Sequence, residues 1–146
     1  MGLTIDTSVL IDFFTKKDLD RYRKSEILLK VARGVIPIYC PKIILAEIYG
    51  VLVRYSIKLA NLGYNFAFNN FNLLGEEEIF GDVLRICKST GSRDVDAYFA
   101  ATAKLTNSIL ITNDRIMAEN AKKYGIECYY LIEEFDTAME RIKELQ

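Results

Sequence analysis

The feature that most constrains the fold is a series of short, mainly apolar runs, each separated from the next by at least one predicted helix. Continuous apolar character is typical of strands whose two faces are both buried. Such strands, connected through helices, predict an α/β fold in which helices cover both faces of a parallel sheet. With 146 residues and no linker or repeat, the chain is expected to form one domain, residues 1–146. The predicted strands span Leu3–Ile5, Val35–Cys40, Phe71–Leu74, Ser108–Thr112 and Ile126–Leu131.

Helices are predicted between these strands from capping residues, helix-ending glycines and the placement of charge. The first begins at Thr7 or Ser8, and a long helix is expected from Pro41 to about Asn61. The polar and basic segment Lys16–Lys24 is expected to be a loop, and the aromatic, amide-rich segment Gly63–Asn72 is compatible with a helix. The other predicted helices span Ser25–Arg33, Glu76–Thr90, Ser92–Thr106, Asn113–Tyr124 and Glu133–Leu145.

Composition excludes several classes of function. The chain has no histidine, which rules out histidine-based catalytic triads and histidine zinc sites. Cys40, Cys87 and Cys128 are too far apart for a metal motif, and their odd number argues against a disulfide framework, so buried thiols in a reducing cytosol are expected. The net charge of -1 is not that of a strongly basic nucleic-acid binder, so any such contact would need local basic patches or a bound metal. No signal peptide or membrane span is recognised, and a cytoplasmic location is expected.

Four acids interrupt or adjoin apolar stretches, where a carboxylate loses hydration and needs a compensating partner. One of them directly follows a predicted strand, another lies just past a predicted strand, and two lie near the starts of predicted helices. In a parallel α/β sheet, such positions face the edge formed by the carboxyl ends of the strands, where ligands bind. A divalent cation is the natural shared partner for acids gathered there. The four acids are Asp6, Glu47, Asp96 and Asp114.

Each acid also has a structural alternative. Asp6 could be a helix N-cap, and Asp114 could cap its helix together with Asn113. Asp94 competes with Asp96, but its place nearest the helix start suits a capping role. Glu47 has mainly apolar neighbours three and four residues away, which makes a solvated helix face a poor explanation. One shared site explains all four acids more simply than four separate structural roles.

An ordered set of motifs makes the whole chain resemble the PIN domain family, and most of all its VapC-type toxin branch in prokaryotes. These motifs are Asp6–Asp12, Glu47, Asp96–Ala103 and Leu110–Asp114. The resemblance implies a three-layer α/β/α sandwich with a central parallel sheet of four or five strands. It also implies a ribonuclease dependent on Mg²⁺ or Mn²⁺, with an RNA substrate, a VapB-like antitoxin and a homodimeric state.

The resemblance assigns the active site to the four acids, with Thr112 in support. We expect Asp6, Asp96 and Asp114 to hold the metal, and Glu47 to bind a second ion or orient the attacking water. Hydrolysis by metal-activated water predicts 5′-phosphate and 3′-hydroxyl ends. Hydrogen bonds within the site or to phosphate are expected from Thr7, Ser8, Thr112 and Asn113. The predicted RNA contacts are Arg93 and Arg115, while the basic residues Lys16, Lys17, Arg21, Arg23 and Lys24 form either a further RNA contact or a solvated loop.

Other functions remain open at this point. A haloacid dehalogenase-type phosphatase needs a second Asp two residues after the first, and Ser8 occupies that place. A nucleotide-binding Rossmann domain needs a glycine-rich loop after the first strand, which is absent. A PIN-domain RNA-processing nuclease without an antitoxin, or a non-catalytic PIN-like binding subunit, is compatible with the sequence. The aromatic residues Tyr49, Tyr55, Tyr64, Phe66 and Phe68 would serve dimerisation, antitoxin docking or core packing.

Overall fold

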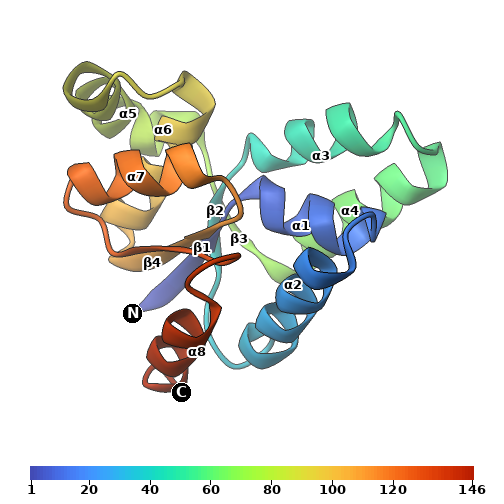
Figure 1. Cartoon of the computed structure of the whole chain (residues 1–146). Helices are drawn as coiled ribbons and strands as arrows, with labels where there is room; N and C mark the ends of the chain where they lie inside the picture. The colour runs from blue at the N-terminus through green and yellow to red at the C-terminus, as the bar shows by residue number, and fades with distance from the viewer.

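The computed structural model describes residues 1–146 and contains five parallel strands at the centre of the molecule (Figure 1). β1 (Gly2–Ile5), β4 (Ser108–Thr112) and β5 (Cys128–Tyr130) form one sheet in the order β1-β4-β5. β2 (Tyr39–Pro41) pairs with β3 (Asn72–Leu74). A parallel bridge between Leu3 and Ile38 joins this pair to β1. The predicted parallel sheet of four or five strands is confirmed.

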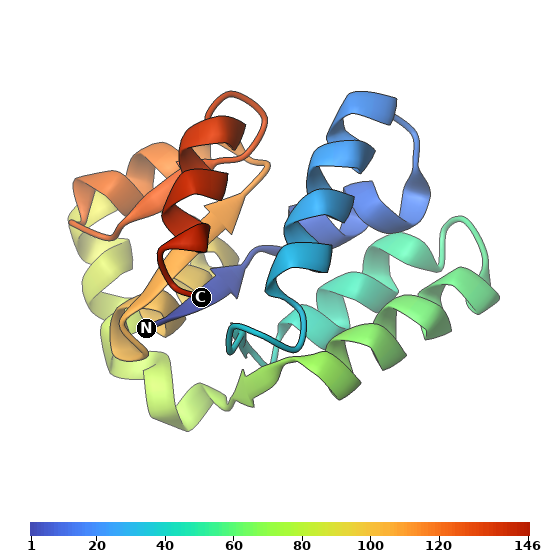
Figure 2. The same cartoon turned by 90° about the horizontal axis from the view of Figure 1, so that it is seen from below.

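Helices cover both faces of this sheet. α6 and α7 pack on one face, with α5 outside α6, and α8 lies below the other face with α2 beside it (Figure 1). α3 and α4 form a helical pair that projects away from β1 and β4 (Figure 2). No helix has the length and apolar character needed to cross a bilayer. The helices are α1 (Thr7–Thr15), α2 (Leu19–Ala32), α3 (Ile44–Leu52), α4 (Ile57–Asn70), α5 (Glu76–Thr90), α6 (Asp94–Leu105), α7 (Arg115–Lys123) and α8 (Phe135–Lys143).

The hydrophobic core lies between these layers. Its position explains why the strand sequences are mainly apolar. Leu3 and Ile5 of β1 stand opposite Ile109 and Ile111 of β4, and all four side chains are fully buried. Every residue of β1 and β4 is buried, so both faces of these two strands leave water on folding, and this burial is a large stabilising contribution. The same packing fixes the register, so the two strands end at the same edge of the sheet.

Two segment predictions were wrong. The expected loop Lys16–Lys24 is mostly α2, which begins at Leu19 because the Asp18 carboxylate accepts a hydrogen bond of 3.1 Å from the Arg21 backbone N–H. The expected long helix Pro41–Asn61 is two helices, because Pro41 ends β2 and the chain turns after Leu52. α4 then restarts at Ile57 and includes most of the segment whose structure the sequence left open.

The restart of α4 depends on Ser56, whose hydroxyl oxygen accepts a hydrogen bond of 3.0 Å from the Leu59 backbone N–H. Ser56→Ala removes this N-cap and is expected to lower the free energy of unfolding by about 1 kcal/mol. Urea denaturation followed by circular dichroism measures the change. Ser56→Asp keeps an acceptor at the same position and should stay close to the wild type; equal losses in the two variants would contradict the capping role.

Candidate functional site

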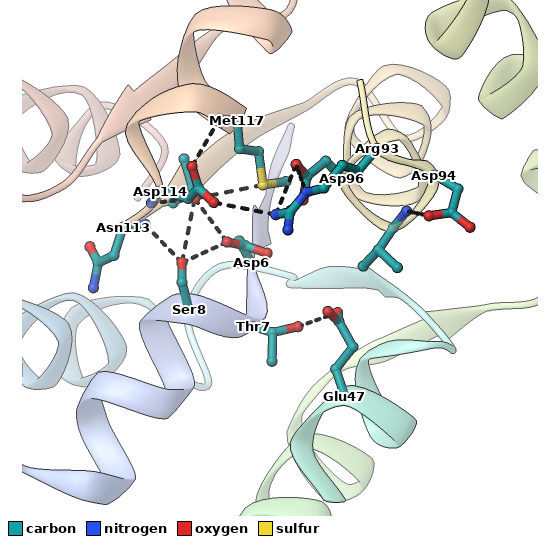
Figure 3. Close-up of polar contacts among 12 residues, drawn as sticks. Asp6, Thr7, Ser8, Glu47, Arg93, Asp94, Asp96, Asn113, Asp114 and Met117 are labelled. Carbon is teal, nitrogen blue, oxygen red and sulfur yellow. Dashed lines mark hydrogen bonds and ion pairs between the residues drawn. The ribbon is translucent and has the colours of Figure 1, made fainter. Parts of the chain in front are cut away.

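An open cavity of about 260 Å³ lies where the carboxyl ends of β1 and β4 meet the first turns of α3 and α6. Asp6 directly follows β1 and Asp114 follows β4 by two residues, while Glu47 and Asp96 come from the first turns of their helices. All four side chains line this cavity and come together from four separate segments of the chain (Figure 3). The convergence expected from the strand ends is therefore found; the chemical roles of the acids stay predictions.

Asp6 is held by two hydroxyl groups that reach the same carboxylate oxygen. The Ser8 hydroxyl donates to Asp6 Oδ2 over 2.6 Å (Figure 3). The Thr112 hydroxyl donates to the same oxygen over 2.8 Å. Burial raises the pKa of Asp6 to about 6; the two hydrogen bonds oppose this shift, and the charges of Asp96 and Asp114 add to it. Only 6% of Asp6 is exposed, so its ionised form lacks the hydration that would otherwise stabilise it.

Thr112 connects two of the acids, because its hydroxyl oxygen also accepts a hydrogen bond of 2.9 Å from the Asp114 backbone N–H. Asp114 in turn accepts a hydrogen bond of 3.1 Å from the Met117 backbone N–H, so it caps α7. Asp114 therefore caps its helix as the alternative expected, but without the side chain of Asn113, which bonds Asp12 and Ser25, and Asp114 also lines the cavity. Its second carboxylate oxygen, Oδ2, points toward Arg93.

Glu47 reaches the cavity from α3. The Thr7 hydroxyl donates to Glu47 Oε1 over 2.6 Å, which ties α3 to the start of α1 (Figure 3). Burial raises the pKa of Glu47 to about 7, and this shift exceeds the lowering effect of the Thr7 hydrogen bond. Glu47 is therefore a carboxylate that can gain or lose a proton near neutral pH.

Arg93 lies between two of the acids. Its Nη2 atom is 3.3 Å from Asp96 Oδ1 and 3.6 Å from Asp114 Oδ2, while 74% of its side chain is exposed (Figure 3). Burial raises the pKa of Asp96, and the Arg93 guanidinium offsets part of this shift. Asp94 accepts a hydrogen bond from the Val95 backbone N–H and does not line the cavity, as expected of a residue at a helix start.

Asp12 and Arg21 also line the cavity and were missed as individual site residues. Arg21 Nε lies 3.0 Å from Asp12 Oδ2, and Asn113 Nδ2 donates to that same oxygen over 2.6 Å. Asn113 thus supports Asp12, and its backbone N–H donates to Ser8 Oγ over 2.9 Å. Asp12 is four residues after Ser8 on α1, and this helical spacing was the available signal.

The structure does not bring Arg115 to the cavity, contrary to its predicted position among the RNA contacts. Its guanidinium forms an ion pair with the Glu133 carboxylate and lies 5.2 Å from the centre of the Tyr130 ring. Arg115 is the first residue of α7, and its side chain points toward the end of β5. The Asp114 carboxylate points the other way, toward Arg93 at the start of α6.

The donor set suits a hard divalent cation, since it consists of carboxylate and hydroxyl oxygens without nitrogen or sulfur. In the present arrangement, no three Asp, Glu, His or Cys side chains converge closely enough to ligate one ion. The Arg93 guanidinium bonds two of the candidate ligands instead. The carboxylates that line the cavity are the kind of ligand that such a cation takes, and they would have to move closer together to share one ion. Burial is the main cause of the raised pKa values of Asp6 and Glu47, and a cation would stabilise the ionised form of both.

A PIN domain family model matches residues 3–123, and the chain therefore belongs to the PIN domain family. No curated protein matches the chain.

Solved structures share the fold. A toxin-antitoxin complex from Klebsiella pneumoniae is 22% identical over 78% of this chain and 87% of that one, with a TM-score of 0.62. VapBC2 from Rickettsia felis, bound to a DNA fragment from its promoter, is 18% identical over 88% and 98% of the two chains, with a TM-score of 0.61. A protein from Pyrobaculum aerophilum is 17% identical over 99% and 90%, with a TM-score of 0.64.

Proposed function

We propose that the protein is an endoribonuclease dependent on Mg²⁺ or Mn²⁺ and the toxin of a type II, VapBC-like toxin–antitoxin pair. Membership in the PIN domain family supports a nuclease. The observation that carries the proposal is the meeting of Asp6, Glu47, Asp96 and Asp114 in one cavity. Buried acids with raised pKa values are a costly arrangement, and they are most often found where chemistry requires them.

In this proposal Asp6, Asp96 and Asp114 hold the metal. The bound ion would neutralise the carboxylates, attract the phosphate and lower the pKa of a water molecule. Ser8 and Thr112 keep Asp6 oriented toward the cavity, as the hydrogen-bonding groups around metal ligands generally do. Asn113 does not contact the proposed metal ligands through its side chain. It donates hydrogen bonds to Asp12 and Ser8 and so holds these two residues in place.

Glu47 orients the attacking water and accepts its proton. The Thr7 hydroxyl fixes its position, and a carboxylate held within reach of a water molecule is a suitable general base. Arg93, at the exposed rim, can contact the RNA phosphate through its planar group of N–H donors.

The proposal is tested by incubating purified protein with RNA in Mn²⁺, in Mg²⁺ or in EDTA. Cleavage is expected with the cations and not with EDTA, and the products should carry 5′-phosphate and 3′-hydroxyl ends, because activated water attacks without the RNA 2′-hydroxyl. Mass spectrometry of the fragments identifies these ends. Cyclic 2′,3′-phosphate products, or cleavage in EDTA, would contradict the proposed chemistry.

The toxin assignment rests on the fold shared with the Klebsiella pneumoniae complex and with VapBC2 from Rickettsia felis. The partner in this proposal is a small VapB-like antitoxin whose extended tail covers the acidic cavity. A gene for a short DNA-binding protein immediately upstream would favour this reading over an RNA-processing nuclease that acts alone.

We also propose a homodimer formed through an aromatic strip on the projecting helices. Tyr64 stacks between Tyr49 and Phe68, with ring centres 4.9 Å and 5.8 Å apart, and Phe68 is 57% exposed. Phe66 instead packs against the core beside Phe71. Stacked, exposed aromatic rings are typical of protein interfaces.

Phe68→Ser is expected to shift the protein from dimer to monomer in sedimentation velocity at micromolar concentration. Phe80→Ser is the matched control, because Phe80 is also exposed, at 44%, but lies on α5. A monomeric wild type would contradict the dimer, and loss of the dimer in both variants would contradict the role of the strip.

A further inference from the structure

The Arg93 guanidinium occupies the space between two candidate metal ligands. Nη2 lies 3.3 Å from Asp96 Oδ1 and 3.6 Å from Asp114 Oδ2, and Nε lies 3.3 Å from Asp96 Oδ2 (Figure 3). One positive group thus bonds carboxylates that come from α6 and from the end of β4. A metal ligated by both acids needs the same oxygens.

Arg93 is free to leave this position. It is the N-cap residue of α6, and 74% of its side chain is exposed, so a change of rotamer would place the guanidinium in water without disturbing the core. Its side-chain bonds are those to Asp96 and Asp114, and ion pairs of such exposed groups contribute little to stability. A divalent cation carries twice the charge and binds carboxylates at shorter distances, so it has the advantage in a direct competition.

We propose that Arg93 is an internal counter-ion that compensates Asp96 and Asp114 before the metal arrives and competes with the metal for them. This inference rests on the proposed metal-dependent function and deepens it. Arg93 lowers the apparent metal affinity in two ways, because it occupies carboxylate oxygens and because its charge repels a cation. Once displaced, its guanidinium is available for the substrate phosphate.

The test is a Mn²⁺ titration of cation-free protein, in which the electron paramagnetic resonance signal of free Mn²⁺ measures binding without substrate. Arg93→Gln is expected to lower the Kd for Mn²⁺ roughly two- to fivefold, which corresponds to the loss of an exposed ion pair. Arg93→Lys keeps the charge but loses the planar fork of donors, so its Kd should fall between those of the wild type and Arg93→Gln. Arg85→Gln is the matched control: Arg85 pairs with Asp82 at 2.8 Å and is 65% exposed, yet it does not line the cavity.

Thermal unfolding of the same proteins separates a counter-ion from a purely structural ion pair. Without cations, Arg93→Gln should unfold at a lower temperature than the wild type, because two carboxylates lose their partner. In saturating Mn²⁺ this difference should disappear. The inference would be overturned if the Kd of Arg93→Gln were equal to or higher than that of the wild type. It would also be overturned if Arg93→Gln lost the same stability with and without Mn²⁺.

The two proposals fail in different ways. Mn²⁺ binding that is unchanged by Arg93→Gln overturns the counter-ion and leaves the metal-dependent nuclease standing. Absence of Mn²⁺ binding in the wild type and in Arg93→Gln overturns both.

Discussion

Asp96→Asn is expected to abolish RNA cleavage while the protein stays folded. The amide has nearly the same size as the carboxylate but no charge, so the proposed metal loses a ligand although the packing of α6 is retained. Removing a group that only supports a metal ligand costs about 10- to 100-fold in activity or affinity, and removing a ligand itself should cost at least as much. We therefore expect the cleavage rate in saturating Mn²⁺ to fall by about 100-fold or more.

Asp94→Asn is the matched control for this experiment. Asp94 lies two residues earlier on α6, carries the same charge and bonds only the start of its own helix. Its variant should cleave RNA within about twofold of the wild type, since surface changes away from a site have small effects. Circular dichroism confirms that both variants are folded. Wild-type cleavage by Asp96→Asn would contradict the proposed role of Asp96 as a metal ligand.

In EDTA, the protein is expected to become less stable as the pH rises from about 4 to 7. The pKa of Asp6 is about 6 in the folded protein, above its ordinary value of 3.8, so the folded state binds more protons than the unfolded state in this interval. Stability falls with pH wherever that is so. The shift of Asp6 corresponds to about 3 kcal/mol, present below its ordinary pKa and lost as the pH passes through its folded value. Glu47, whose pKa is about 7, changes stability in the same direction.

Urea denaturation at pH 5 and pH 7.5 measures this loss. Asp6→Asn should reduce the dependence, because one of the titrating groups is gone while Glu47 remains, and Mn²⁺ should restore stability at pH 7.5 by binding the ionised acids. The pKa values of Glu127 and Glu134 are lowered from 4.5, so these groups change stability mainly below pH 5. They therefore do not mask the loss of stability measured between pH 5 and pH 7.5. A wild type that gains stability between pH 5 and 7.5 in EDTA would contradict the buried, uncompensated state of Asp6.

The parts of the fold that could be predicted are those in which burial dictates the sequence. β1 and β4 have apolar residues on both faces, so their runs and the acids that follow them stand out. The sequence did not predict the break between α3 and α4, because apolar residues continue through Val53. Ser56, the N-cap of α4, is a weak signal for a new helix beside that apolar pattern. Tertiary packing of the projecting pair, which no local pattern reveals, decides where the chain turns.

The site could be predicted as a set of acids but not as a network of contacts. Asp6 and Asp114 were found from their places after strands, whereas the pairing of Arg21 with Asp12 required α2 to begin at Leu19, inside a segment expected to be a loop. Arg93 and Arg115 look equivalent in sequence, each lying within three residues of an acid. Helix geometry separates them, because it directs Arg93 into the cavity and Arg115 toward Glu133.

The buried carboxylate after β1 has a consequence for laboratory evolution. A screen for heat-resistant variants in chelating buffer at neutral pH would enrich neutral replacements at position 6, because each relieves the burden of an unhydrated charge. If Asp6 holds the metal as proposed, the survivors would unfold at a higher temperature than their parent and would no longer cleave RNA. Stability without a cation and the proposed chemistry would then place opposite demands on one side chain.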